Sequence, residues 1–219
     1  PLNSGQEEVL PRRFHRRPYA YLKIAEGCNN KCSFCTIPTI KGPYHSRPLE
    51  NIVAEAGQLV GRGVKELILV AQDTTAYGLD YYGQYRLPQL LRQLVKLSGL
   101  EWLRLLYTYP TRITPELIEV MATEAKVVSY LDLPLQHASG SILKSMQRAG
   151  DAKTAIRTIE KLRRAIPEIA LRSTFIVGYP GEKEHDFKEL LDFMSFIKFD
   201  WVGAFKYSPE EGTAAAQLP

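Results

Sequence analysis

The sequence has few of the residues that mark several protein classes. Its 219 residues include only three cysteines, four histidines, three methionines and two tryptophans. No stretch approaches the ~18 consecutive apolar residues of a membrane span, and the first residues lack the apolar run of a signal peptide. Three cysteines within eight residues cannot build a disulfide framework, and such a set is typical of metal ligation. These absences predict a soluble, cytoplasmic protein with no membrane partner.

Strong charge imbalance is also missing. The net charge is only +4 and 45% of the residues are apolar, which excludes a disordered chain and favours a single domain with a sizeable core. Four arginines between Pro11 and Pro18 form a local basic stretch, which is either a phosphate contact or, as we favour, a solvated linker. We find no Ser/His/Asp triad, paired-carboxylate site or phosphate-binding loop.

From about residue 18, short apolar runs alternate with longer helical patterns, which is typical of repeated βα units. The predicted strands are Tyr19 to Ala25, Glu66 to Ala71, Trp102 to Tyr107, Val127 to Leu133, Ile169 to Val177 and Trp201 to Phe205. Right-handed crossovers between them predict an α/β fold, an open, partial (β/α)6 barrel of the TIM type, with ligands at the carboxyl ends of the strands.

The cysteines lie just past the end of the first predicted strand. The spacing of Cys28, Cys32 and Cys35 lets one loop bind three irons of a cubane and leaves the fourth iron without a protein ligand. That open iron suits the amino and carboxylate groups of S-adenosylmethionine (SAM), whose sulfonium can accept an electron from the cluster. Two alternatives remain: a structural zinc site completed by a histidine such as His45 or His137, and three unligated core cysteines. Ligand count and spacing favour the cluster.

Other candidate site residues follow later strands. Gln72 and Asp73 follow the second strand and are expected to accept hydrogen bonds from the cofactor's ammonium group, although Asp73 also suits a capped turn. Arg172, in the fifth strand, would pair with the cofactor carboxylate if it points inward, and would be a surface charge if it points outward.

Three further positions are expected to contact SAM. Gly178 lies in the turn after the fifth strand, where a missing side chain lets backbone approach the adenosine. Gln136 ends the fourth strand and would reach the ribose or the substrate, whereas the neighbouring His137 is equally well explained as a hydrogen-bonded structural residue. Phe34 either packs beside the adenine or plugs the barrel.

Longer sequence motifs carry a resemblance that covers almost all of residues 18–213. They are the cysteine loop with Phe34, the segment Ala71 to Asp80, the segment Tyr130 to Ser139, the segment Leu171 to Glu182 and the segment Phe205 to Thr213. Together they resemble the radical SAM methylthiotransferases. Within that family, Gln72 to Gly78 is similar to the branch that modifies a ribosomal protein rather than the branch that modifies tRNA adenosine. The chain departs from the usual family pattern at Ala149, Tyr179 and Lys183.

The resemblance implies a reaction, cofactors and partners. SAM bound to a [4Fe-4S] cluster would be cleaved reductively to a 5′-deoxyadenosyl radical, and a methylthio group would be placed on the β-carbon of an aspartate in the twelfth protein of the small ribosomal subunit. A reductant such as flavodoxin and nearby ribosomal RNA would be further partners. The alternatives are methylthiolation of tRNA adenosine and, from another class, a zinc-stabilised RNA- or ribosome-binding module.

The same resemblance divides the chain. We expect residues 1–17 to be a linker from an N-terminal domain that holds a second [4Fe-4S] cluster, residues 18–207 to be the radical SAM core, and residues 208–219 to be a tail leading to a C-terminal β-barrel domain. Both flanking domains lie outside this sequence. We therefore expect a core that binds one cluster but does not complete sulfur insertion.

Overall fold

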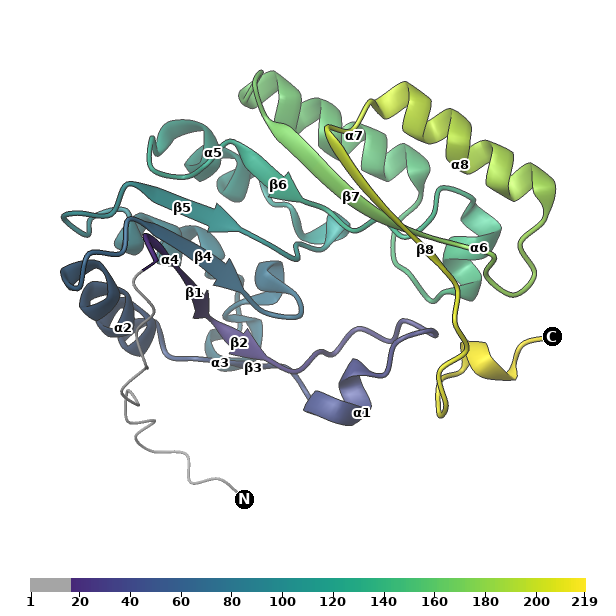
Figure 1. Ribbon diagram of the computed structural model, residues 1–219, viewed down its shortest axis with the longest axis horizontal. Helices are drawn as coiled ribbons and strands as arrows, with labels where there is room; N and C mark the ends of the chain where they lie inside the picture. The colour runs from purple at the N-terminus through teal and green to yellow at the C-terminus, as the bar shows by residue number, and fades with distance from the viewer. Residues whose placement is uncertain (1–16) are drawn as a thin grey trace.

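The computed structural model describes residues 17–219, and it has the predicted α/β architecture (Figure 1). The predicted N-terminal linker lies almost wholly outside the described residues. The strands are β1 (Tyr19–Lys23), β2 (Ala25–Glu26), β3 (His45–Ser46), β4 (Glu66–Val70), β5 (Trp102–Leu105), β6 (Tyr130–Asp132), β7 (Ala170–Val177) and β8 (Trp201–Lys206).

Six of these strands form the open parallel barrel. The hydrogen-bonded order is β1-β4-β5 in one half and β6-β7-β8 in the other. A single bridge between Leu103 and Val127, with hydrogen bonds around it, joins the two halves. The strands β1 and β8 lie at opposite edges of the arched sheet and do not close on each other (Figure 1). The predicted open, partial barrel is confirmed.

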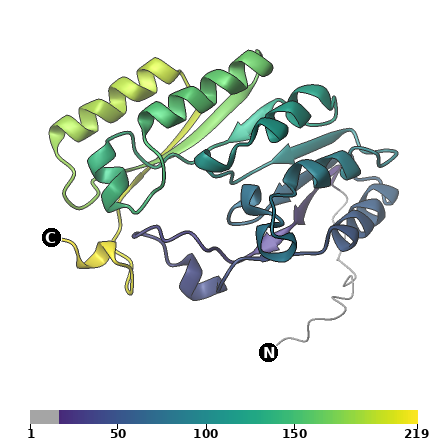
Figure 2. The same ribbon diagram turned by 180° about the vertical axis from the view of Figure 1, so that it is seen from behind.

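Helices cover the outer face of this sheet, as the view from behind shows (Figure 2). The helices are α1 (Ile37–Lys41), α2 (Leu49–Gly61), α3 (Leu79–Tyr82), α4 (Leu87–Leu94), α5 (Pro115–Thr123), α6 (Gly140–Ser145), α7 (Ala152–Ala165) and α8 (Glu184–Ile197). Shorter 3₁₀ turns are η1 (Thr74–Ala76), η2 (Pro110–Arg112) and η3 (Ala215–Gln217). Among the described residues, no helix is long and apolar enough to cross a membrane.

Periodic apolar residues explain the longer helices and the core. Leu90, Leu91 and Leu94 of α4 are fully buried against the sheet, so the three-and-four spacing in the sequence correctly places the buried face. Local sequence also explains the start of α5, because the Thr114 hydroxyl accepts a hydrogen bond from Leu117 N at 3.1 Å and Pro115 begins the helix.

Two local features differ from the predicted pattern. The first predicted strand is broken between Lys23 and Ala25, because β2 leaves the parallel sheet and pairs antiparallel with β3. The predicted fourth strand is reduced to Tyr130–Asp132, since Val127 contributes only an isolated bridge. The short β2–β3 pair turns the chain into the cysteine loop.

The end of the chain is more ordered than its small, polar composition indicated. Ala215 is fully buried with Ile142, Met146 and Tyr179, and Phe34 packs against this cluster. The backbone N–H of Ala215 donates to the carbonyl of Ser33 at 2.8 Å. The segment after residue 207 is therefore packed against the cysteine loop.

Candidate functional site

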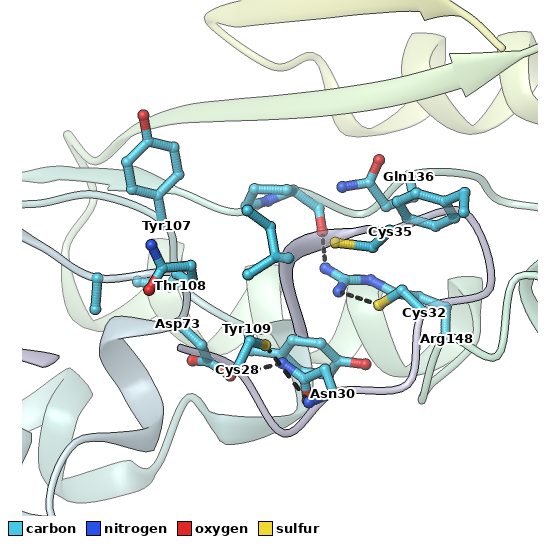
Figure 3. Close-up of a pocket in the computed structure, with 15 residues that line it drawn as sticks. Cys28, Asn30, Cys32, Cys35, Asp73, Tyr107, Thr108, Tyr109, Gln136 and Arg148 are labelled. Atoms are coloured by element: carbon cyan, nitrogen blue, oxygen red, sulfur yellow. Dashed lines mark hydrogen bonds between the residues drawn. The ribbon is translucent and has the colours of Figure 1, made fainter. Parts of the chain in front are cut away.

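A cavity of about 410 Å³ lies at the carboxyl ends of the strands, where an α/β barrel places its ligands. All three cysteines line it, together with residues that follow β4, β5 and β6 (Figure 3). These residues include Gln72 and Asp73 after β4, Tyr107 to Tyr109 after β5, and Gln136 after β6. Arg148, which follows α6, completes the wall.

The cysteine loop has a fixed backbone path. Gly27 begins it at a φ of 75°, and Cys28 N donates to the carbonyl of Gly42 at 3.2 Å. Within the loop, Asn30 N donates to the Cys28 sulfur at 3.4 Å, and Cys35 N donates to the carbonyl of Cys32 at 3.1 Å. Such N–H···S bonds are common around cluster-ligating sulfurs.

The three thiols are free, half-buried and directed to one cavity. Burial raises the pKa of both the Cys28 and the Cys35 thiol. Ligation needs the thiolate, so a bound cation must displace these protons.

A single zinc ion and a cubane cluster require different arrangements of their cysteine ligands. Zinc needs about four ligands converging on one point at ~2.0–2.3 Å, whereas a cubane presents a separate iron to each cysteine. Among the described residues, no three His, Cys, Asp or Glu side chains converge on a position for one ion. Neither His45 nor His137 lines the cavity. The donor set therefore fits a multi-iron cluster with three protein ligands.

Asp73 organises the wall opposite the cysteine loop. It caps η1, and its carboxylate accepts hydrogen bonds from Thr75 Oγ1 at 2.6 Å and from Ala76 N at 3.2 Å. Asn30 Nδ2 donates to the other oxygen at 3.1 Å, and Arg112 also donates to that oxygen. A carboxylate can accept about four hydrogen bonds, so these donors from the protein fill the acceptor positions of Asp73. The capped-turn interpretation of Asp73 is thus confirmed, and its carboxylate fixes the cysteine loop through Asn30.

Arg148 is a residue of the site that the sequence interpretation missed. Its Nη1 donates to the Cys32 sulfur at 3.5 Å, its Nη2 donates to the carbonyl of Pro134 at 2.5 Å, and its guanidinium lies 4.1 Å from the centre of the Tyr109 ring (Figure 3). The only sequence signal is a basic residue at the end of a helix, which is far too common to indicate a site.

A second layer of contacts lies behind the cysteine loop. Ser33, between the second and third cysteines, donates its N–H to the carbonyl of Met146 at 3.0 Å and its hydroxyl to the carbonyl of Ser145 at 2.8 Å. The Tyr179 hydroxyl lies 2.8 Å from the Ser33 hydroxyl. The end of α6, the turn after β7 and η3 therefore all hold the loop at Ser33.

The structure brings together four of the six predicted cofactor contacts. Phe34, Gln72, Asp73 and Gln136 line the cavity, and Gln136, which follows β6, adopts a φ of 75°. The other two lie elsewhere.

Arg172 and Gly178 do not line the cavity. Arg172 does have an anionic partner, but that partner is Asp132 on the neighbouring strand, at 2.6 Å. Gly178 is exposed in the turn after β7, with a φ of 69°. The sequence correctly placed Arg172 in a strand and Gly178 in the turn after it. It did not show that Arg172 pairs with Asp132 or that Gly178 lies outside the cavity.

Comparison with known proteins agrees with this geometry. The sequence profile of the Radical SAM superfamily matches residues 22–194. The chain belongs to the radical SAM superfamily. Solved structures with the same fold include the radical SAM methyltransferase TsrM from Kitasatospora setae, with a TM-score of 0.70 and 18% identity over 86% of this chain and 36% of that chain. Coproporphyrinogen III oxidase (HemN) from Escherichia coli has a TM-score of 0.64 and 19% identity over 93% of this chain and 49% of that chain.

Curated relatives are much more similar in sequence. The "Ribosomal protein uS12 methylthiotransferase RimO" of Moorella thermoacetica is 70% identical over 96% of this chain and 49% of that protein. The protein of the same name from Pelotomaculum thermopropionicum is 57% identical over 97% of this chain and 48% of that protein. The chain thus spans about half the length of the curated relatives it matches.

Proposed function

We propose that this chain is the radical SAM core of a methylthiotransferase that acts on an aspartate of the small-subunit ribosomal protein uS12. The observation that carries the proposal is the set of three cysteine thiols around one cavity at the strand ends. The substrate class rests on relatives of 70% and 57% identity that bear the uS12 methylthiotransferase name.

Each part of the cavity has a role in this function. A [4Fe-4S] cluster with SAM supplies reductive cleavage of the sulfonium and so a radical able to take hydrogen from an unactivated carbon. Cys28, Cys32 and Cys35 would hold this cluster through their thiolates. Asp73, through Asn30, fixes the loop that carries them.

The other lining residues bind and orient. Gln72 is exposed at the end of β4, where its amide offers both a donor and an acceptor to the cofactor's amino acid group. Gln136 offers the same groups from the end of β6, and Phe34 offers a ring face to the adenine. Arg172 and Gly178 lie outside this cavity, so a direct role of either in binding SAM would need the cofactor to extend toward β7.

The partners follow from the same reaction. The substrate is the uS12 protein, on or off the ribosome, and a reductant such as flavodoxin delivers the electron. Ribosomal RNA lies close to any enzyme that acts on an assembled subunit. All of these are cytoplasmic components of a bacterial cell.

The test uses anaerobic reconstitution of the protein with iron and sulfide. Iron and sulfide content and 5′-deoxyadenosine are measured on this core, and methylthio transfer to a uS12 peptide is measured on a full-length enzyme that carries the core, with a tRNA anticodon stem as the competing substrate. We expect about four irons per chain, with loss of the cluster and of 5′-deoxyadenosine in Cys32→Ser. Lys31→Ser, an exposed change in the same loop, is the matched control and should retain both.

The outcomes separate the parts of the proposal. A colourless protein with one zinc per chain would overturn the radical function. Methylthio product on tRNA instead of on the peptide would overturn the substrate class alone.

A further inference from the structure

Arg148 holds a position that the proposed function does not by itself require. None of the three cysteines is its neighbour in sequence, yet its guanidinium lies at the Cys32 sulfur, with an Nη1···Sγ distance of 3.5 Å. The guanidinium is permanently charged and half-buried, so little solvent screens its effect on the sulfur.

The surrounding residues fix this charge in place. Nη2 is bound to the Pro134 carbonyl at 2.5 Å, and the Tyr109 ring lies 4.1 Å from the guanidinium carbon. The Tyr109 hydroxyl in turn accepts a hydrogen bond from Ala149 N at 3.2 Å, which anchors the ring to the turn that carries Arg148. Residues that follow β5, β6 and α6 thus together hold the Arg148 side chain.

This position has an energetic cost. The Nε of Arg148 is buried and finds no hydrogen-bond partner among the described residues, and a buried donor without an acceptor destabilises a fold. An arginine that served packing alone would gain from a rotamer that exposes Nε to water. A cost of this kind is expected where a charge is held for function.

The charges around the three sulfurs are also unequal. Arg148 lies at the Cys32 sulfur, whereas Asp73 lies near Cys28 and accepts a hydrogen bond from Asn30 at 3.1 Å. A positive charge therefore faces Cys32, and a negative charge, paired with Arg112, lies on the side of Cys28.

We propose that Arg148 is a positioning residue that raises the reduction potential of the bound cluster through its hydrogen bond and charge at the Cys32 sulfur. The inference rests on the proposed function, because it requires a cluster on these cysteines. Reduction adds one negative charge to the cluster, and a fixed cation beside a ligating sulfur stabilises the reduced form more than the oxidised form. Arg148 thereby makes the electron transfer that starts the reaction accessible to a weaker reductant.

The test is a potentiometric titration of the reconstituted protein, followed by electron paramagnetic resonance of the reduced cluster. In Arg148→Gln the charge is lost, and we expect at least a tenfold fall in the ratio of reduced to oxidised cluster at a fixed potential, which corresponds to about 59 mV for a one-electron couple. Arg148→Lys keeps a positive charge but loses the planar guanidinium donors, so its reduction potential should lie between those of Arg148→Gln and the wild type. Arg157→Gln, on the exposed face of α7, is the matched control and should titrate as wild type.

The outcomes distinguish this inference from the function beneath it. A wild-type protein that holds no cluster refutes the proposed function, and with it this inference. A wild-type cluster whose potential is unchanged in Arg148→Gln refutes the inference alone. If Arg148→Gln assembles no cluster, Arg148→Lys decides. A reduction potential of the Lys variant below that of the wild type supports the role of Arg148. An unchanged reduction potential, together with loss of an exchangeable proton coupling at the cluster, overturns that role.

Discussion

Gly27 sets the direction in which the chain enters the cysteine loop. It has a φ of 75°, and a Cβ at this position would overlap the carbonyl oxygen of Pro43 and lie 2.7 Å from that of Gly42. Gly42 has nearly the same φ, 74°, but a Cβ there would meet no atom within 4 Å. An alanine at position 42 would therefore suffer backbone strain alone, whereas an alanine at position 27 would also overlap the backbone of Pro43.

Replacing each glycine by alanine tests this difference. Gly42→Ala should cost about 1–3 kcal/mol, because a φ of 74° with a ψ of −166° lies in a backbone region that essentially only glycine populates. Gly27→Ala should cost clearly more, because the Pro43 backbone must also move, and it should reduce cluster loading by displacing Cys28. Urea unfolding and iron content measure the two effects. Equal unfolding free energies for the two variants would contradict this account of Gly27.

His137 is a buried residue whose role is structural in this fold. Its side chain is fully buried, its Nδ1 accepts a hydrogen bond from Ser139 N at 2.9 Å, and its Nε2 lies 3.7 Å from the Glu182 carboxylate. Burial lowers the pKa of His137 below its ordinary value of 6.5, despite the nearby Glu182. The hydrogen-bonded structural interpretation of this histidine agrees with these contacts.

The lowered pKa predicts a pH-dependent stability. Below pH 6.5 the unfolded chain binds a proton at His137 that the folded chain does not, so the free energy of unfolding falls as the pH decreases through this region. Above pH 6.5 the contribution is complete. Urea unfolding of the wild type between pH 5.5 and 7.5 should show this slope, and His137→Asn should flatten it. His45→Asn, at an exposed position, should keep the wild-type slope.

At the scale of elements, the cysteine loop is held from behind by segments that are distant in sequence. The hydroxyl of Tyr179, in the turn between β7 and α8, lies 2.8 Å from the Ser33 hydroxyl and donates to the Ser145 carbonyl at 3.2 Å. Tyr179 also packs on Tyr207, with ring centres 5.3 Å apart. The Tyr207 hydroxyl is buried without a hydrogen-bond partner among residues 17–219.

These two tyrosines provide a matched pair of substitutions. Tyr179→Phe removes the one hydroxyl proton that Ser33 Oγ and the Ser145 carbonyl share, and it should destabilise the protein by about 1 kcal/mol, while Ser33 keeps its bond to Ser145 and the cluster still loads. Tyr207→Phe removes a hydroxyl that has no partner and should be neutral or slightly stabilising. Urea unfolding measures the free energy of unfolding of both variants. A larger loss of stability in Tyr207→Phe than in Tyr179→Phe would contradict this account of the two hydroxyls.

The sequence predicts the elements with internal patterns and misses those made by distant pairing. The parallel strands follow from apolar runs and the main helices from their periodicity, and the cysteine spacing locates the cavity. The β2–β3 pair has two residues in each strand, too few for any pattern to appear. Arg148 and Arg172 are both arginines in unremarkable local sequences, and only the folded sheet reveals that one meets Cys32 and the other Asp132.

At the scale of the whole molecule, the site spans the junction between the two halves of the barrel. The cysteine loop and Asp73 belong to the half that contains β1 and β4, and Gln136 and Arg148 belong to the half that contains β6 and β7. Asp132 of β6 is a main link between them. Its buried carboxylate accepts hydrogen bonds from Tyr107 N, after β5, at 3.1 Å and from Arg172 of β7 at 2.6 Å.

Asp132→Ala should therefore loosen the junction as well as lower stability. It leaves Arg172 without its carboxylate and Tyr107 N without its acceptor, and because Arg172 is about one-third exposed we expect a loss of about 2 kcal/mol rather than the ~3–5 kcal/mol of a fully buried pair. Glu66→Ala breaks the comparable Glu66–Arg104 pair, at 2.6 Å, which joins β4 and β5 within one half. It is the control for losing an ion pair without affecting the junction.

Hydrogen exchange distinguishes the two variants. The amides of Leu103, Val128 and Thr108, which donate across the β5–β6 junction, should exchange faster in Asp132→Ala and at near wild-type rates in Glu66→Ala. Because Tyr107 and Thr108 also line the cavity, the Asp132 variant should in addition bind SAM more weakly at unchanged iron content. If the junction amides remain as protected as in the wild type, the two halves are held together by side-chain packing in the core, and Asp132 serves only its local ion pair.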